Sequence, residues 1–202
     1  FLTGSDWERE GVHLSSLPTR DAVLPIVSVL HLAKMRKIPL SELFSTSFEN
    51  RFSHSDIVDN TTPGMESYTA DIGKEIIQTL SPGDKSITQL DFQRDSCTVH
   101  RENQQLEKVS RDTSLAFQEI RQRISSVFGP SEGFGEVGSI NFIDGVRVTF
   151  TNNETLHLRP SGNAPEFRTY GLATTRERAE EIVEKRLEAI PRLLSKISGA
   201  GS

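Results

Sequence analysis

Residues 139–172 read SINFIDGVRVTFTNNETLHLRPSGNAPEFRTYGL, and this stretch decides the fold. Apolar and polar residues alternate over residues 139–150 on both sides of Asp144-Gly145, which is the sequence pattern of a β-hairpin. Two further strands are expected at Thr155–Leu158 and Phe167–Leu172. The stretch therefore predicts four consecutive antiparallel strands.

Helical periodicity flanks these strands on both sides. Before them, apolar residues at three- and four-residue spacing predict a helix that starts near Asp112 and ends at Gly129-Pro130. After them, Thr174 and Glu177 form a capping box for a long helix, in which we expect Pro191 to cause a kink. The fold class is therefore α+β, an antiparallel sheet with helices packed on one face.

The N-terminal part of the chain carries a helix of its own. Thr19 and Asp21 stand at its expected cap, apolar residues recur at helical spacing from Val23 to Ala33, and Pro39 ends it. Its apolar stretch is far shorter than the roughly 18 residues that a membrane span needs. We therefore expect a core helix and no membrane anchor.

A change of composition separates this helix from the rest. Between about Ser45 and Asp91 the chain is rich in Ser, Thr, Asn, Asp and Pro, with one short helical stretch before Pro82-Gly83. We expect a hinge or linker at about residues 45–51, and Ser53-His54 to lie in a solvated polar loop. A surface loop on one continuous domain is the alternative for this segment.

Charge and cysteine content exclude some functions. The 202 residues include 23 Lys and Arg against 28 Asp and Glu, which gives a net charge of −5 and no global electrostatic case for binding nucleic acid. Cys97 is the one cysteine, so no internal disulfide can form, and the default location is the reducing cytoplasm. We expect Cys97 to be buried and inert.

One loop combines residue types that bind phosphate. Arg159 ends one expected strand and Arg168 lies early in the next, so a tight reversal brings two guanidinium groups together. Between them, Ser161 supplies a hydroxyl, Gly162 permits an anion-binding backbone nest, and Asn163 adds an amide donor. A polar hairpin loop with solvated arginines is the alternative interpretation.

The string RPSGNAPEFR at residues 159–168, placed after the Asp-Gly hairpin, resembles the C-terminal phosphate-binding domain of the α-D-phosphohexomutases. The similarity is to the branch of phosphomannomutases and phosphoglucomutases. It covers about residues 50–202, and residues 1–44 resemble the end of the family's third domain. The resemblance thus implies two parts, residues 1–45 and residues 46–202.

The resemblance implies reversible transfer of a phosphoryl group between the 1- and 6-positions of a hexose. In this family a phosphoserine of the first domain reacts, Mg²⁺ bound in the second domain assists, and the fourth domain holds the phosphate that does not react. Arg159, Ser161, Gly162, Asn163 and Arg168 would then be substrate-phosphate ligands. The chain alone would contain no catalytic residue and no metal ligand, and would be inactive.

The chain also departs from the family pattern. It has no Asp-Gly-Asp-x-Asp string for Mg²⁺ and no Thr-Ala-Ser-His-Asn string, so both sites are expected in upstream domains. The family's sugar-recognition pattern Glu-x-Ser-Gly is also incomplete at Phe1–Ser5, because the glutamate is missing. The preference for mannose or glucose is therefore left open. Thr3, Ser5 and Arg20 are candidates for hydroxyl contacts. For Trp7 two interpretations are open, stacking on a sugar or packing against the remainder of the third domain. The competing hypothesis is a non-catalytic module that binds a phosphorylated or acidic peptide.

Overall fold

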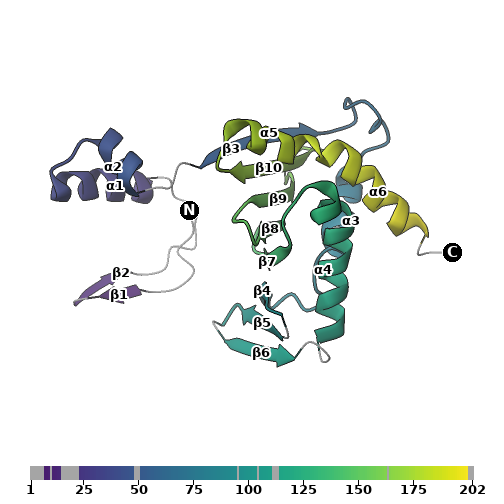
Figure 1. Cartoon of the computed structure of the whole chain (residues 1–202), viewed down its shortest axis with the longest axis horizontal. Coiled ribbons are helices and arrows are strands. Elements are labelled where there is room, and N and C mark those ends of the chain that lie inside the picture. Colours follow the sequence, from purple (N-terminus) through teal and green to yellow (C-terminus); the bar gives the residue numbers. More distant parts are fainter. Residues whose placement is uncertain are drawn as a thin grey trace. The chain divides into compact units, whose positions relative to one another are not determined.

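The chain divides into two compact units, Phe1–Asn50 and Arg51–Ser202 (Figure 1). The computed structural model describes most of both units. The described residues are 7–9, 11–14, 23–47, 51–94, 96–103, 105–110, 114–162 and 164–199.

The first unit contains a hairpin and two helices. Strands β1 (Trp7–Arg9) and β2 (Val12–Leu14) pair antiparallel around Gly11, whose φ of 77° is accessible to glycine at little cost. Helices α1 (Val23–Arg36) and α2 (Leu40–Ser47) follow. The sequence analysis took Pro39 only as the end of a helix. The Pro39 carbonyl accepts hydrogen bonds from the amides of Glu42 and Leu43 and thereby starts a second helix. Helix α2 was not predicted, because Pro39 was expected only to end a helix.

The apolar face of α1 is not a buried core face in the described structure. Val23, Ile26, Val27 and Leu30 are each 50% exposed or more, and within α1 only Ala33 is classed as buried. Residues of α1 and α2, among them Ile26, Leu30 and Leu40, line an apolar hollow of about 320 Å³. The prediction of a core helix is therefore wrong for the chain as described, although the helix itself is confirmed.

The second unit is built on an eight-stranded sheet among its described residues, with strand order β3-β10-β9-β8-β7-β4-β5-β6. Every neighbouring pair is antiparallel. The strands are β3 (Phe52–Val58), β4 (Ile87–Phe92), β5 (Ser96–Arg101), β6 (Leu106–Ser110), β7 (Val137–Asn141), β8 (Val146–Phe150), β9 (Thr155–Pro160) and β10 (Phe167–Ala173).

The four strands expected from residues 139–172 are confirmed as β7 to β10, whereas β3 to β6 were missed. Strand β3 is an edge strand in which only Val58 is buried, so it shows no apolar alternation. The prediction that Ser53-His54 lies in a loop is therefore wrong. The charged residues Arg101, Glu107 and Lys108 belong to the paired strands β5 and β6.

Among the described residues of this unit, four helices pack on one face of the sheet, and Figure 1 shows their arrangement. They are α3 (Ala70–Thr79), α4 (Leu115–Phe128), α5 (Arg176–Glu184) and α6 (Arg186–Gly199), and a short 3-10 turn, Pro130–Glu132, follows α4. The long C-terminal helix is thus divided at Lys185, while Pro191 lies inside α6. The cap of α5 is Thr175 and not Thr174, because the Thr175 hydroxyl accepts from the Arg178 amide.

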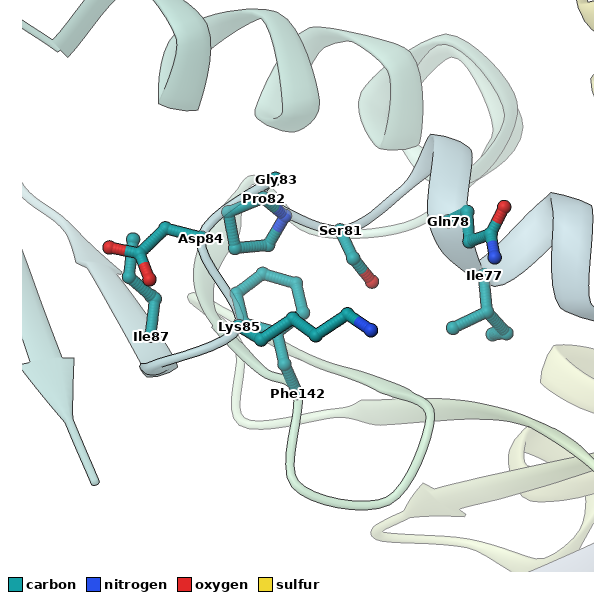
Figure 2. A pocket seen from close by; sticks show the side chains of 9 residues that line it. All are labelled: Ile77, Gln78, Ser81, Pro82, Gly83, Asp84, Lys85, Ile87 and Phe142. Carbon is teal, nitrogen blue, oxygen red and sulfur yellow. The ribbon is translucent and has the colours of Figure 1, made fainter.

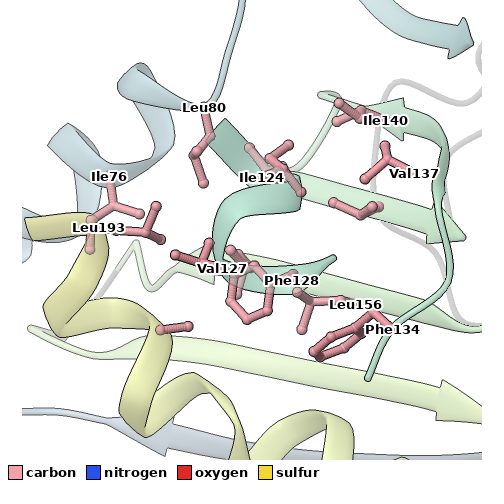
Figure 3. Packing of buried hydrophobic residues seen from close by; sticks show 14 of the residues in the cluster. Ile76, Leu80, Ile124, Val127, Phe128, Phe134, Val137, Ile140, Leu156 and Leu193 are labelled. Carbon is pink, nitrogen blue, oxygen red and sulfur yellow. The ribbon is translucent and has the colours of Figure 1, made fainter. Parts of the chain in front are cut away.

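The core of the second unit lies between the helices and the covered face of the sheet. Figure 3 shows side chains of α3, α4 and α6 converging on those of the strands. Phe128 of α4 and Leu156 of β9 are fully buried there, and burying side chains of this size contributes about 1.5–3 kcal/mol each. The expected fold class, an antiparallel sheet with helices on one face, is confirmed.

The other face of the sheet carries polar side chains, because alternate residues of each strand point away from the helices. Along β9, Leu156 and Leu158 are buried, whereas Thr155, His157 and Arg159 are only partly covered. We call this surface the open face. In the part of the chain that the structure describes, no helix has both the length and the apolar character needed to span a bilayer.

Candidate functional site

The loop between β9 and β10 is the candidate site, and the register of these strands places its two arginines side by side. Arg159 of β9 is the direct partner of Arg168 of β10. Beyond them Pro160 pairs with Phe167, and the Ser161 amide donates to the Glu166 carbonyl at 2.8 Å. The loop is therefore closed at its base, and both guanidinium groups belong to the open face.

Arg159 is held by the neighbouring hairpin. Its Nε lies 2.9 Å from the Asp144 carboxylate, and its side chain remains 25% exposed. Asp144 can reach it because Gly145 turns the chain with a φ of 85° and lets the Leu158 carbonyl approach closely. A Cβ on Gly145 would lie 2.3 Å from that oxygen. The Asp-Gly turn therefore orients the first arginine of the loop.

Arg168 is held from its own strand. Its guanidinium lies 3.1 Å from the Glu166 carboxylate, and this contact, with a smaller contribution from the Tyr170 hydroxyl, raises the pKa of Arg168 above its ordinary value. Its side chain is 42% exposed. Among the described residues, its buried Nε has no hydrogen-bond partner. One donor of this arginine is thus unsatisfied at the base of the loop.

Two guanidinium groups that face each other across a strand pair repel one another. Each has one carboxylate partner, Asp144 for Arg159 and Glu166 for Arg168, and both arginine side chains remain accessible to solvent. An anion between them would be attracted by both charges, and the planar guanidinium matches the oxygen spacing of a phosphate. The arrangement can therefore bind an anion, and it contains no nucleophile.

The rest of the predicted phosphate site is described in part. Ser161 lies at the closed base of the loop, and Gly162 is exposed at its tip. A Cβ on Gly162 would meet nothing within 4 Å, and its φ is not in the left-handed region, so the chain's own packing does not require glycine here. The space over Gly162 is open. Asn163, the fifth predicted ligand, lies outside the described residues, as do Thr3, Ser5, Arg20 and the side chain of Trp7.

Packed aromatic side chains support the loop from the covered face. Phe167, next to Arg168, is fully buried and makes an edge contact with Tyr68 at a ring distance of 6.4 Å. Gly73 of α3 leaves the room for the Tyr68 hydroxyl, which lies only 2.3 Å from the position of a Cβ there. Burial raises the pKa of Tyr68 to about 12, so the phenol stays neutral. The base of β10 is thus anchored in the core.

Two residues considered for chemistry have structural explanations. Cys97 is fully buried in β5, and burial, with the nearby Asp91 charge, raises the pKa of its thiol to about 11. The thiol is protonated at neutral pH, as expected for an inert cysteine. His157 lies on the open face, and its Nε2 is 2.5 Å from the Asp144 carbonyl oxygen. Among the described residues, no group of three or more His, Cys, Asp or Glu side chains could hold a metal ion.

A separate pocket of about 480 Å³ lies where α3 ends and the chain enters β4. Figure 2 shows Lys85 extended beside Phe142 and Ser81, while the Asp84 carboxylate is directed away from them. Asp84 instead binds Arg101 at 2.6 Å, and hydrogen bonds from Arg101 and Ser86 lower the pKa of Asp84 to about 2. The charged groups beside this pocket therefore serve mainly to join β5 to the α3–β4 turn.

The residues that orient the two arginines were not predicted from the sequence. Asp144 was recognised only as a turn residue, Glu166 as an unassigned loop position, and Tyr170 only as part of a strand. The strand alternation did carry a signal for Tyr170, because it stands two residues after Arg168 and hence on the same face. Nothing in the spacing alone indicates the ion pair between Asp144 and Arg159, which depends on the β8–β9 register.

Comparison with known proteins gives two relatives, and no protein-family model matches the chain. A phosphomannomutase of Sinorhizobium fredii (strain NBRC 101917 / NGR234) is 27% identical over 189 residues, and a phosphomannomutase of Salmonella muenchen is 29% identical over 192 residues. Each match covers 94% of this chain, which spans about 30% of the length of the curated relatives it matches. These two matches support a relationship between this chain and the phosphohexomutases.

Proposed function

We propose that this chain is the phosphate-binding, C-terminal portion of a phosphohexomutase of the phosphomannomutase type. The whole protein would interconvert a hexose 1-phosphate and a hexose 6-phosphate, with Arg159, Ser161, Gly162, Asn163 and Arg168 as ligands of the phosphate that does not react. The chain alone would bind this phosphate and would not catalyse. The two phosphomannomutase relatives support the reaction, at an identity below 30%.

The observation that carries the proposal is the direct pairing of Arg159 with Arg168 across β9 and β10. Their mutual repulsion is relieved by a dianion, which the solvent-accessible parts of both guanidinium groups can contact. The open space over Gly162 gives a phosphate room to approach the backbone amides of the loop. Binding energy from this remote phosphate would position the sugar for chemistry elsewhere.

The proposal requires domains outside this chain. The phosphoserine would lie in one of them, and Mg²⁺, held in another, would supply charge neutralisation during phosphoryl transfer. The exposed apolar face of α1, with Val23, Ile26, Val27 and Leu30, supports the view that residues 1–45 complete a domain whose remainder covers this face. Residues 46–202 would form the separate phosphate-binding domain. The sugar, mannose or glucose, would be selected outside the loop.

The test is a titration of the 202-residue chain with mannose 1-phosphate, glucose 1-phosphate and glucose 1,6-bisphosphate, observed through the loop amides by NMR. We expect saturable shifts at Ser161 and Gly162 with millimolar affinity, because one phosphate site recovers only part of the binding energy of the whole enzyme. The double variant Arg159→Ala, Arg168→Ala should lose binding by about 10-fold or more, since hydrogen bonds to charged groups contribute about 1.5–3 kcal/mol each.

The matched control is the double variant Lys85→Ala, Lys108→Ala, which removes the same charge from two exposed positions away from the loop. It should bind as the original chain does. If both double variants lose sugar-phosphate affinity equally, the loss is explained by the change in net charge alone, and this result would contradict a specific phosphate site in the loop. Binding of an acidic or phosphorylated peptide with no response to any sugar phosphate would favour the competing peptide-binding module.

A further inference from the structure

A second groove lies on the open face beside the loop, and its function is not explained by the phosphate site. It has a volume of about 460 Å³ and extends over β8, β9, β10 and the start of β3. The strand register sets Arg147, His157, Tyr170 and Ser55 in one row across the four strands. All of the groove belongs to the second unit, and we call it the open-face groove.

The lining of the open-face groove is cationic. Arg51 and Arg147 contribute guanidinium groups and His157 an imidazole, and the described residues that line the groove include no carboxylate. The chain as a whole has a net charge of −5, so this groove is a local exception. A site with two guanidinium groups and no acid favours an anion.

Hydroxyl groups complete the polar lining. Thr149 of β8 pairs directly with Thr155 of β9, so their side chains stand together on the open face, and Ser53 of β3 lines the same groove. Hydroxyl groups both donate and accept hydrogen bonds. Together with the arginines they can satisfy a phosphate group and the hydroxyls of an attached ring.

Two rings inside the groove provide a surface for stacking. His157 and Tyr170 are cross-strand partners, and their rings stack at a centroid distance of 5.4 Å with 28° between the ring planes. An aromatic or sugar ring in the groove can extend this stack, and Arg147, the partner of His157 on β8, stands at its side. The groove thus places a ring surface next to a cation.

Arg51 is fixed at one end of the groove. Its guanidinium donates to the carbonyl of Asn153 in the β8–β9 turn, where Asn153 itself has a φ of 64°. This contact joins the start of β3 to a turn two strands away. A guanidinium held in place loses less conformational freedom when it binds an anion.

The open-face groove is not the phosphate loop. Along β9, His157 precedes Arg159 by two residues, a separation of about 7 Å, and Thr155 precedes it by twice that distance. One phosphate cannot therefore contact the loop and the far end of the groove together. The two sites are adjacent at Tyr170, which lines the groove and follows Arg168 by two residues on the same face of β10.

We propose that the open-face groove is a second binding site, for a phosphate group carried on a ring. Arg51 and Arg147 bind the phosphate, and the ring packs against the stacked pair of His157 and Tyr170. A nucleoside monophosphate and a hexose phosphate both have this chemistry. The site is independent of the phosphate loop, and of the proposed function.

The experiment uses the chain with the loop already disabled by Arg159→Ala and Arg168→Ala, so that failure of the loop cannot affect the result. Adenosine 5′-monophosphate, glucose 6-phosphate and inorganic phosphate are titrated separately, and the amides of Thr155, His157 and Tyr170 are followed by NMR. We expect at least one ring phosphate to saturate these signals and to bind about 10-fold or more tightly than inorganic phosphate. The compound that binds more tightly shows whether the site prefers a nucleotide or a hexose phosphate.

Two further substitutions in this background assign the roles. Arg147→Gln changes an exposed side chain and should weaken the ring phosphate about 10-fold, whereas Lys108→Gln, on the open face of β6 at the opposite edge of the sheet, should change nothing. His157→Ser should weaken the ring phosphate and leave inorganic phosphate unaffected. Unchanged amide spectra elsewhere establish that each variant is folded.

Three results would overturn the proposal. The first is that no ring phosphate shifts the amide signals of the groove, even at a ligand concentration about 10-fold above the millimolar affinity expected for the loop. The second is that inorganic phosphate binds as tightly as both ring phosphates, which removes the role of the ring stack. The third is that Arg147→Gln and Lys108→Gln have equal effects, which reduces the binding to general charge attraction.

Discussion

The covered and the open face of the same sheet are built from the same strands and have opposite chemistry. Along β9, Leu156 and Leu158 are at most 1% exposed, while Thr155, His157 and Arg159 between and beside them remain partly accessible. Since successive side chains of a strand point to opposite faces, each strand contributes to both. The covered face holds the apolar core, and the open face holds Arg147, Arg159 and Arg168.

This division separates stability from binding. The covered face buries apolar side chains from four helices and the sheet, which is the dominant favourable contribution to folding. The open face pairs Arg159 directly with Arg168, and two like charges opposite each other do little for stability without a ligand. Substitutions on the two faces should therefore have different measurable effects.

The largest effect on stability should follow a cavity in the covered face. Phe128 of α4 is fully buried and meets Phe134 edge to face, with ring centroids 5.6 Å apart. Phe128→Ala should lower the free energy of unfolding by about 3–5 kcal/mol, measured by urea denaturation. Under conditions in which the variant is folded, sugar-phosphate binding at the loop should be unchanged. A loss of affinity in the folded variant would contradict the separation of the two faces.

A smaller and pH-dependent effect is expected at the ion pair that joins α5 to the β8–β9 turn. Arg178 binds both carboxylate oxygens of Glu154, at 2.7 and 2.8 Å, and these hydrogen bonds lower the pKa of Glu154 below its ordinary value of 4.5. Glu154→Gln should reduce the free energy of unfolding by about 1.5–3 kcal/mol near pH 7, because hydrogen bonds between charged groups are lost.

The sign of the pH dependence follows from the lowered pKa. The unfolded chain protonates Glu154 first as the pH falls, so the stabilisation is complete above the ordinary value of 4.5 and is lost as the pH falls through the lower pKa of the folded state. The difference between the original chain and Glu154→Gln should therefore shrink below about pH 4.5, in urea denaturation at several pH values. A difference that stays constant down to pH 3 would contradict this assignment.

The elements that could be predicted from the sequence are those whose apolar residues recur at the period of the secondary structure that they form. Strands β7 to β10 and helices α3 and α4 have apolar residues at the correct period, and all of them formed as expected. Strand β3 has no such pattern, since six of its seven residues are not buried and its pairing with β10 is what makes it a strand. Edge strands depend on a partner that is distant in sequence, and local rules do not detect them.

The candidate site was proposed from its residue types, whereas its contacts were not predicted. Guanidinium groups at residues 159 and 168 with a tight reversal between them already implied that the two charges meet, and the register confirms it. The orientation of each arginine depends on Asp144 and Glu166, and the open-face groove depends on four strands from positions more than 100 residues apart. Spacing along the chain carries no information about such neighbours.

The smallest expected effect is at Gly162, where one substitution should change folding stability and phosphate binding in opposite directions. A Cβ at Gly162 would meet no atom of the chain within 4 Å, and the φ of Gly162 is not in the left-handed region. Gly162→Ala should therefore raise the free energy of unfolding by about 0.4–1 kcal/mol, because alanine restricts the unfolded chain. If phosphate uses the open space over Gly162, the same methyl group should weaken binding of glucose 1,6-bisphosphate, measured by NMR titration.

Gly83→Ala is the matched control for this prediction, because Gly83 also lies in a loop, has open space at its Cβ position and lines the pocket beside α3. It should be stabilised to a similar degree and should bind phosphate as the original chain does. Opposite changes of stability and affinity in Gly162→Ala alone would establish that glycine is required at this position by the ligand and not by the fold. If Gly162→Ala binds as tightly as Gly83→Ala, the backbone of the loop tip does not contact the phosphate, and binding rests on the paired side chains of Arg159 and Arg168.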